Sequence, residues 1–318
     1  MRAKIFLITV IVAVIFFMNT TCAAKSGVID VESSVQEIGC HQNVTFAQYF
    51  KWPESRLQMD IFLPDVKGKS PAVIFVPGGW WLTAPKAAGI QICYQLAQAG
   101  FVAASIEYRH IGTANYIDSI GDVKAAVRYL RAHADDFNID KNKIAVMGMS
   151  AGGYLASMVG VTSSIDKFNF GDNLQERVDV QAVVDIFGPT DLTKLADDFS
   201  ADKQKLYYSP AAPPALFVNG VPCYKGSRGG NLREMPVTAR ESNPITYINK
   251  NTPPFLIMHG NADTTVSPSQ SKILYDALIS QGLDADYYVL NGGKHNAAHF
   301  YQPTAFKIIV DFLNRTLR

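Results

Sequence analysis

Cysteine is scarce in this sequence, and the spacing of its four cysteines suggests neither a metal site nor a disulfide scaffold. No Cys-x-x-Cys pair is present, and four thiols are too few to staple 318 residues together. The six histidines also lack metal-site spacing. We therefore expect no metal and no other cofactor. Cys93 lies in an apolar, helix-like stretch and is expected to be buried, whereas a bridge between Cys40 and Cys223 stays open.

An excess of charge of one sign is also missing. Lys and Arg number 29 against 28 Asp and Glu, so nothing predicts nucleic acid or an anionic membrane as a partner. The nucleotide-binding patterns are absent too. No Gly-x-Gly-x-x-Gly follows the first strands, and Gly68-Lys69-Ser70 has Leu63 where a phosphate loop needs its first glycine. With 48% apolar residues and no low-complexity tract, the chain is expected to be globular.

Residues 1–24 have the pattern of a secretory signal peptide. Arg2 and Lys4 precede a run of fourteen residues in which only Thr9 is polar, and Cys22-Ala23-Ala24 supplies small residues for cleavage before Lys25. The run is shorter than the ~20 residues that span a bilayer. We therefore expect a secreted or periplasmic mature chain without a membrane span. A retained anchor and lipid attachment at Cys22 are the alternatives.

Residues 25–318 are expected to form a single α/β domain. Short, unbroken apolar runs of the kind found in parallel sheets alternate with amphipathic helical patterns. The expected strands are 57–63, 72–76, 101–106, 144–147, 180–187, 255–258 and 287–290, and the expected helices are 120–131, 154–159, 273–278 and 306–317. This pattern predicts a mostly parallel central sheet with helices on both faces.

Residues 192–252 interrupt the alternation. They are polar and rich in Pro, Gly and Asn. A structureless loop of that length is uncommon inside a compact domain. We interpret the segment as an insertion over the sheet that acts as a partial lid, and not as a second domain.

The strongest chemical signal is Gly148-Met149-Ser150-Ala151-Gly152, which follows an expected strand and precedes a helical stretch. A Gly-x-Ser-x-Gly segment in that context makes a sharp turn that exposes the serine hydroxyl, and glycines two residues on either side avoid clashes. The helix N-terminus beside it favours developing negative charge. Ser150 is therefore the candidate nucleophile.

A serine nucleophile needs a histidine base and an orienting carboxylate, in the chain order Ser, acid, His. Asp263 follows the strand 255–258 and is the preferred acid; Asp191, which follows 180–187, is the runner-up, with a capping role as its competing interpretation. His295 lies in the loop after the last strand and is preferred over His299 as the base. His259 is interpreted as structural.

The loop after the strand 72–76 reads Pro77-Gly78-Gly79-Trp80-Trp81. Its glycines would let the backbone approach a substrate oxygen, so the amides of Gly79 and Trp80, together with that of Ala151, are the candidate oxyanion hole. Trp81 is a candidate substrate-binding residue, with ordinary packing as the alternative.

From about residue 56 to its end, the chain resembles α/β-hydrolase carboxylesterases, especially secreted feruloyl and acetyl-xylan esterases and their hormone-sensitive-lipase-like relatives. The shared motifs occur in the family's order and are Pro77-Gly78-Gly79-Trp80, Ser105-Ile106-Glu107-Tyr108-Arg109, Asp122, Gly148 to Gly153, Gly188-Pro189-Thr190-Asp191, His259 to Asp263 and Gly293-Lys294-His295. One departure is Pro77, which replaces a histidine of the family's oxyanion loop. The resemblance implies Ser150, Asp263 and His295 as the triad.

The leading hypothesis is thus an exported serine carboxylesterase that acts on a small-molecule or polysaccharide-linked ester, including acetyl or feruloyl esters of plant polysaccharide. The alternatives are a serine exopeptidase of the prolyl-oligopeptidase type and a non-catalytic binding protein on the same scaffold. Cleavage of an X-Pro anilide would favour the exopeptidase, and failure to react with a fluorophosphonate would favour the binding protein.

Overall fold

The computed structural model describes residues 28, 30, 37–50, 55–222 and 226–318. The predicted leader and Cys223 lie outside these residues, so the signal peptide and the Cys40–Cys223 bridge stay predictions. The chain divides into two units, 1–35 and 36–318, and all described helices and strands belong to the second.

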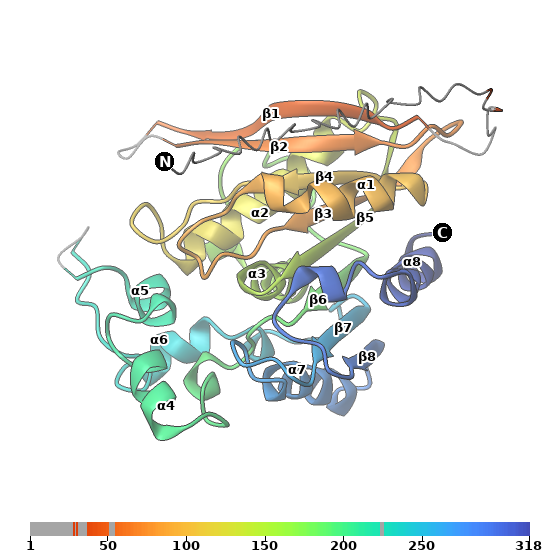
Figure 1. The fold of residues 1–318 in the computed structure, drawn as a ribbon. Helices are drawn as coiled ribbons and strands as arrows, with labels where there is room; N and C mark the ends of the chain where they lie inside the picture. The colour runs from red at the N-terminus through yellow and green to blue at the C-terminus, as the bar shows by residue number, and fades with distance from the viewer. Residues whose placement is uncertain (1–27, 29, 31–36, 51–54, 223–225) are drawn as a thin grey trace, which may run out of the picture. The chain divides into compact units, whose positions relative to one another are not determined.

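The second unit is built on an eight-stranded sheet with the order β1-β2-β4-β3-β5-β6-β7-β8 (Figure 1). β2 pairs antiparallel with both of its neighbours, and the remaining pairings are parallel. The strands are β1 Gly39–Tyr49, β2 Ser55–Leu63, β3 Ser70–Val76, β4 Val102–Ile106, β5 Ile139–Met149, β6 Ala182–Ile186, β7 Phe255–Gly260 and β8 Ala285–Leu290.

Seven of these strands overlap the predicted apolar runs, and β1 is the one the sequence did not indicate. Seven of the eleven β1 residues are exposed or half-buried at the sheet edge before the strand reaches Phe46, and its register shifts twice against β2. An edge strand with that burial carries little hydrophobic alternation, so its pattern resembles a polar loop.

The longer helices are α1 Ile90–Gln98, α2 Tyr116–Ala132, α3 Ala151–Val161, α7 Ser269–Ser280 and α8 Pro303–Leu317. Side chains of successive strand residues enter different cores: Ile74 packs in the core that includes α2, α3 and α7, and Val73 in the core that includes α1 and α8. The helices thus cover both faces of the sheet (Figure 1), as predicted. Cys93 of α1 is fully buried, and Cys40 is exposed and has no disulfide partner among the described residues.

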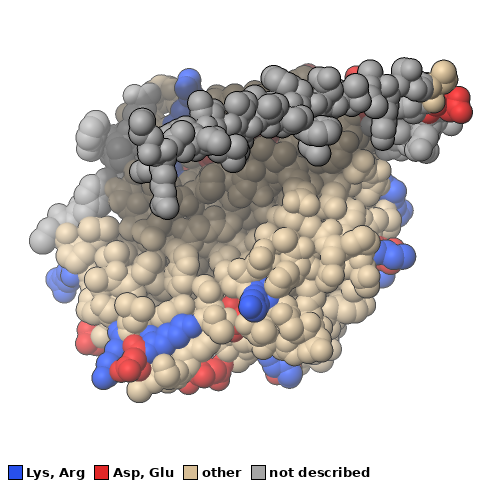
Figure 2. All heavy atoms as spheres, viewed as in Figure 1, with Lys and Arg blue, Asp and Glu red and all other residues tan. Residues whose placement is uncertain are grey.

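The insertion between β6 and β7 folds into short helices, namely α4 Ala201–Tyr207, α5 Pro213–Asn219 and α6 Pro236–Glu241, with single turns at Leu192–Lys194 and Pro244–Thr246. The three helices lie together at one end of the sheet (Figure 1). On the face shown in Figure 2, described Lys and Arg side chains lie beside Asp and Glu near α4, and the middle of that face carries mostly uncharged residues.

Lys124 of α2 is fully buried, and its Nζ donates a 2.5 Å hydrogen bond to the carbonyl oxygen of Thr162. Burial, and then the nearby charge of Arg128, lower the pKa of Lys124 to about 7. Between that value and the pKa of about 10.4 in the unfolded chain, the unfolded state binds more protons than the folded state. Stability therefore rises with pH through this window.

We predict that the free energy of unfolding increases by about 1 kcal/mol per pH unit just above pH 7 because of Lys124. Lys124→Met, which removes the titrating group, should flatten this part of the profile. Urea unfolding of both proteins at pH 7.0, 7.5, 8.0 and 8.5 measures the difference. Parallel profiles for the two proteins would contradict the prediction.

Candidate active site

The site lies where the strand order reverses, between the carboxyl ends of the parallel neighbours β3 and β5. Val76 at the end of β3 pairs with Gly148 of β5, so the loops that follow the two strands meet. A Cβ atom added at Gly78 would lie 3.1 Å from the Cβ of Ser150. Open α/β sheets bind their ligands at this kind of crevice.

Ser150 occupies a strained turn between β5 and α3, with φ 56° and ψ −123°. Non-glycine residues rarely adopt this conformation, and it persists only where the surroundings enforce it. A side chain at Gly148 would overlap the carbonyl oxygen of Gly152, and one at Gly152 would overlap that of Val76. The glycines therefore have the steric role that the sequence spacing predicted.

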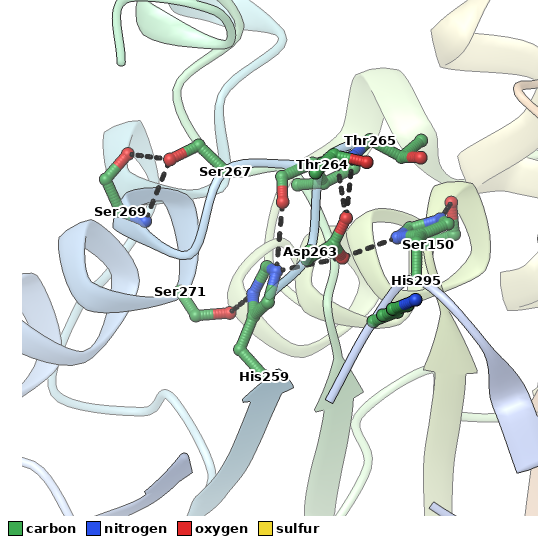
Figure 3. Close-up of polar contacts among 12 residues, drawn as sticks. Ser150, His259, Asp263, Thr264, Thr265, Ser267, Ser269, Ser271 and His295 are labelled. Atoms are coloured by element: carbon green, nitrogen blue, oxygen red, sulfur yellow. Dashed lines mark hydrogen bonds and ion pairs between the residues drawn. The ribbon is translucent and has the colours of Figure 1, made fainter. Parts of the chain in front are cut away.

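The structure brings Ser150, His295 and Asp263 together (Figure 3). Nε2 of His295 lies 2.9 Å from Oγ of Ser150, and its Nδ1 lies 2.7 Å from Oδ2 of Asp263. Because a carboxylate only accepts hydrogen bonds, Nδ1 carries the proton and Nε2 presents its lone pair to the serine hydroxyl. The ring of Phe187 packs against the imidazole at 4.4 Å between centroids.

Four hydrogen bonds hold the carboxylate of Asp263. Oδ1 accepts from the backbone N–H groups of Thr265 and Val266 at 2.7 and 3.1 Å, and Oδ2 accepts from His295 and from His259. Burial alone would raise the pKa of Asp263, but the hydrogen bonds from the two histidines and the backbone hold it well below its usual range. The group is therefore ionised at neutral pH.

His259 is a buried partner of Asp263 that the sequence did not reveal. Its Nε2 lies 3.2 Å from Oδ2 of Asp263 and 3.1 Å from the carbonyl oxygen of Val266, so this nitrogen carries the proton. Its Nδ1 accepts a 2.7 Å hydrogen bond from the hydroxyl of Ser271 on α7 (Figure 3). A histidine at a strand end gives no sign of such partners in the sequence, because Ser271 comes close to it only in the folded chain.

The two alternative residues have other contacts. The carboxylate of Asp191 accepts from the backbone and hydroxyl of Thr193 and from the amide of Asn243, so it caps the turn Leu192–Lys194. Nδ1 of His299 accepts from the backbone N–H of Lys294. Neither residue forms a hydrogen bond or ion pair with Ser150 or His295.

The candidate oxyanion loop is fixed by contacts that do not need the family's histidine. The buried hydroxyl of Tyr108 donates a 3.0 Å hydrogen bond to the carbonyl oxygen of Pro77, and the backbone N–H of Leu82 donates to that of Gly79. Gly79 and Trp80 adopt φ of 141° and 55°. Ala151 is the first residue of α3, so its N–H has no acceptor within the helix.

The two tryptophans of the loop have different surroundings. Trp81 is 2% exposed, and its ring stacks on Phe217 and meets Tyr154 edge to face. Trp80 is half-buried and packs edge to face on Tyr207 of the insertion. Both line a small cavity beside Ser150.

None of the helices in the described part of the chain combines the length and apolar character needed to cross a bilayer. Likewise, the described residues contain no cluster of three or more His, Cys, Asp or Glu side chains suited to a metal ion.

A mostly parallel sheet covered by helices on both faces, with a serine on a strained turn after its fifth strand, defines an α/β-hydrolase. The predicted fold class is therefore confirmed. The chain belongs to the BD-FAE family of α/β-hydrolase esterases, whose model matches residues 59–278. The resemblance inferred from the motifs is confirmed with it.

Solved structures show the same fold over nearly the whole chain. A truncated carbohydrate esterase from the gut microbiota superposes with a TM-score of 0.77 at 28% identity, covering 90% of this chain and 98% of that one. A bifunctional GH43-CE protein of Bacteroides eggerthii superposes with a TM-score of 0.75 at 29% identity, covering 88% of this chain and 38% of the other.

Curated relatives have names that agree with the predicted class of enzyme. Esterase LipC of Mycobacterium tuberculosis is 32% identical over 71% of this chain and 53% of its own length. The probable carboxylic ester hydrolase LipM of the same organism is 31% identical over 67% of this chain and 46% of its own. This chain thus spans about half the length of these relatives.

We predict that His259→Phe lowers the free energy of unfolding by about 2–4 kcal/mol, because it takes away the hydrogen-bond partner of the buried Ser271 hydroxyl and one of the two donors to Oδ2 of Asp263. The double variant His259→Phe/Ser271→Ala should recover about 1 kcal/mol, since the unsatisfied hydroxyl is then gone. Urea unfolding at pH 7.5 measures both. His41→Phe, at an exposed histidine of β1, is the control, and equal stability of His259→Phe and this control would refute the prediction.

Proposed function

We propose that this protein is a serine carboxylesterase that works through an acyl-enzyme, with Ser150 as nucleophile, His295 as base and Asp263 as the orienting carboxylate. One observation carries the proposal: Oγ of Ser150, the imidazole of His295 and the carboxylate of Asp263 form one chain of hydrogen bonds at 2.9 and 2.7 Å. The esterase names of the curated relatives support the same class of reaction.

In the proposed first step, Nε2 of His295 takes the proton from Ser150 as Oγ attacks the ester carbonyl carbon. The resulting imidazolium lies against the ionised Asp263, which stabilises it electrostatically. His295 then passes the proton to the alcohol oxygen, the bond from carbonyl carbon to alcohol oxygen breaks, and the acyl group stays on Ser150. Water, deprotonated by the same imidazole, then attacks the acyl carbon. The bond from this carbon to Oγ of Ser150 breaks, His295 returns the proton to Oγ, and the acid is released.

The negative charge of the tetrahedral intermediate needs donors. We assign this role to the backbone N–H of Ala151, at the N-terminus of α3, and to the N–H groups of Gly79 and Trp80. A helix N-terminus favours negative charge beside it, and donors fixed before the reaction need no reorganisation during it. The hydrogen bond from Tyr108 to Pro77 supports this assignment, because it holds the start of the loop.

The substrate is proposed to be a small-molecule or polysaccharide-linked ester. A neighbouring structure described as a carbohydrate esterase, and one of an acetyl ester-xyloside bifunctional hydrolase from Caldicellulosiruptor lactoaceticus, favour esters attached to sugars. The charged start and apolar run of residues 1–24 support export to the periplasm or medium, with 25–318 as the mature domain.

We predict that Ser150→Ala lowers kcat/KM for p-nitrophenyl acetate by at least about 10³-fold, because it removes the oxygen that forms the acyl-enzyme in the proposed mechanism. The rate of p-nitrophenolate release, corrected for spontaneous hydrolysis, measures this. Ser280→Ala, at an exposed serine on α7, is the matched control and should keep the wild-type rate. Equal rates for wild type and Ser150→Ala would defeat the proposal.

A further inference from the structure

Trp80 lines two cavities. One measures about 10 Å³ and touches Ser150, and it has room for a group of about the size of one water molecule. The other measures about 420 Å³ and does not reach Ser150. The small cavity is lined by Trp80, Trp81, Ser150, Ala151, Pro189, Leu195 and Val266. The large one, here the insertion cavity, is lined by Trp80, Leu82, Leu206, Tyr207, Ser209, Ala211, Ala212, Pro213 and Pro214.

The chemistry of the proposed reaction fixes which part of an ester enters the small cavity. His295 must protonate the leaving alcohol, so the alcohol lies on the His295 side of Ser150. Neither His295 nor Phe187, which packs on it, lines either cavity. The small cavity lies instead beside Ala151 and Trp80, whose amides face the acyl carbonyl in the proposed mechanism. It therefore receives the acyl chain.

The insertion holds the indole of Trp80 in place. Tyr207 of α4 is 7% exposed and meets the indole edge to face, with 5.4 Å between ring centroids. The hydroxyl of Tyr207 donates a 2.8 Å hydrogen bond to the carbonyl oxygen of Thr265, in the loop that carries Asp263. The Nζ of Lys203 donates to the neighbouring carbonyl of Thr264. The ring of Trp80 is thus connected through Tyr207 to the loop that carries Asp263.

We propose that the side chain of Trp80 determines acyl length: it limits the enzyme to esters of short acids, such as acetyl esters, and closes off the insertion cavity. This inference rests on the proposed esterase function and adds its substrate class. Trp80 is the one residue shared by the two lining sets, so its truncation joins a cavity of methyl size to a large apolar one. The joined space accommodates a medium-length acyl chain.

The test compares p-nitrophenyl acetate, butyrate and octanoate, which share one leaving group and differ only in the acid. Wild type should have a much higher kcat/KM for the acetate than for the octanoate. Trp80→Ala keeps the backbone amide and should raise the octanoate-to-acetate ratio of kcat/KM by at least about tenfold, since a new apolar subsite binds the added methylenes. An unchanged ratio in Trp80→Ala, or a wild type that hydrolyses octanoate as fast as acetate, would overturn the proposal.

Two further variants separate this effect from loosening of the site. Leu206→Ala changes only the insertion cavity and should keep the wild-type acyl preference. Ala211→Trp adds bulk to that cavity at an exposed position, so Trp80→Ala/Ala211→Trp should lose most of the octanoate gain. If the double variant keeps the whole gain in the octanoate-to-acetate ratio, the acyl chain does not occupy the insertion cavity and the proposal fails.

Failure of this inference can be told from failure of the proposed function. If wild type neither hydrolyses any of the three esters nor reacts with a fluorophosphonate, the esterase proposal itself is wrong. If wild type reacts and the ratios of Trp80→Ala match it, only the role of Trp80 is wrong. Stoichiometric labelling of Trp80→Ala by the fluorophosphonate verifies that the variant is folded.

Discussion

The parallel pairing of β3 with β5 is the constraint on which the site depends. It sets Val76 beside Gly148, so the loop after one strand meets the serine turn after the other. The end of β3 approaches so closely that Gly152 has no room for a side chain, and the backbone of the serine turn itself leaves none at Gly148. Ser150 is held in its strained conformation by this packing, and the same contact aligns the candidate oxyanion loop with the serine hydroxyl. The strained candidate nucleophile thus rests on a buried sheet, where the core is least able to relax.

The carboxylate of Asp263 connects this rigid end of the sheet to the insertion. Its two oxygens accept hydrogen bonds from His295, from His259 and from the backbone of its own loop, and that loop in turn accepts from Tyr207 and Lys203 of α4. Tyr207 also packs on Trp80. The insertion is therefore more than a cover, because it braces both the loop that carries Asp263 and the ring of Trp80, a residue that lines both cavities.

Much of this arrangement could be predicted from the sequence, and the parts that could not have physical reasons. Ser150 was recognisable because its glycines answer a local steric demand, and the buried strands because both of their faces are apolar. β1 was not, because an edge strand with exposed residues shows no alternation. The short helices of the insertion were not predicted, because the segment is Pro-rich and the helices are too short to show a helical period in the sequence. The hydrogen bond between His259 and Ser271 and the position of Trp80 in the lining of both cavities depend on tertiary contacts, which no local sequence pattern encodes.

The central claim is that Ser150 is the nucleophile and that His295 activates it. Peptide mapping by mass spectrometry after reaction with a fluorophosphonate tests it most directly, with wild type and His295→Gln compared over time. The account predicts a single adduct, on the peptide that contains Ser150, which forms at least about 10³-fold more slowly in His295→Gln. An adduct on a different peptide, or equal rates in the two proteins, would contradict it.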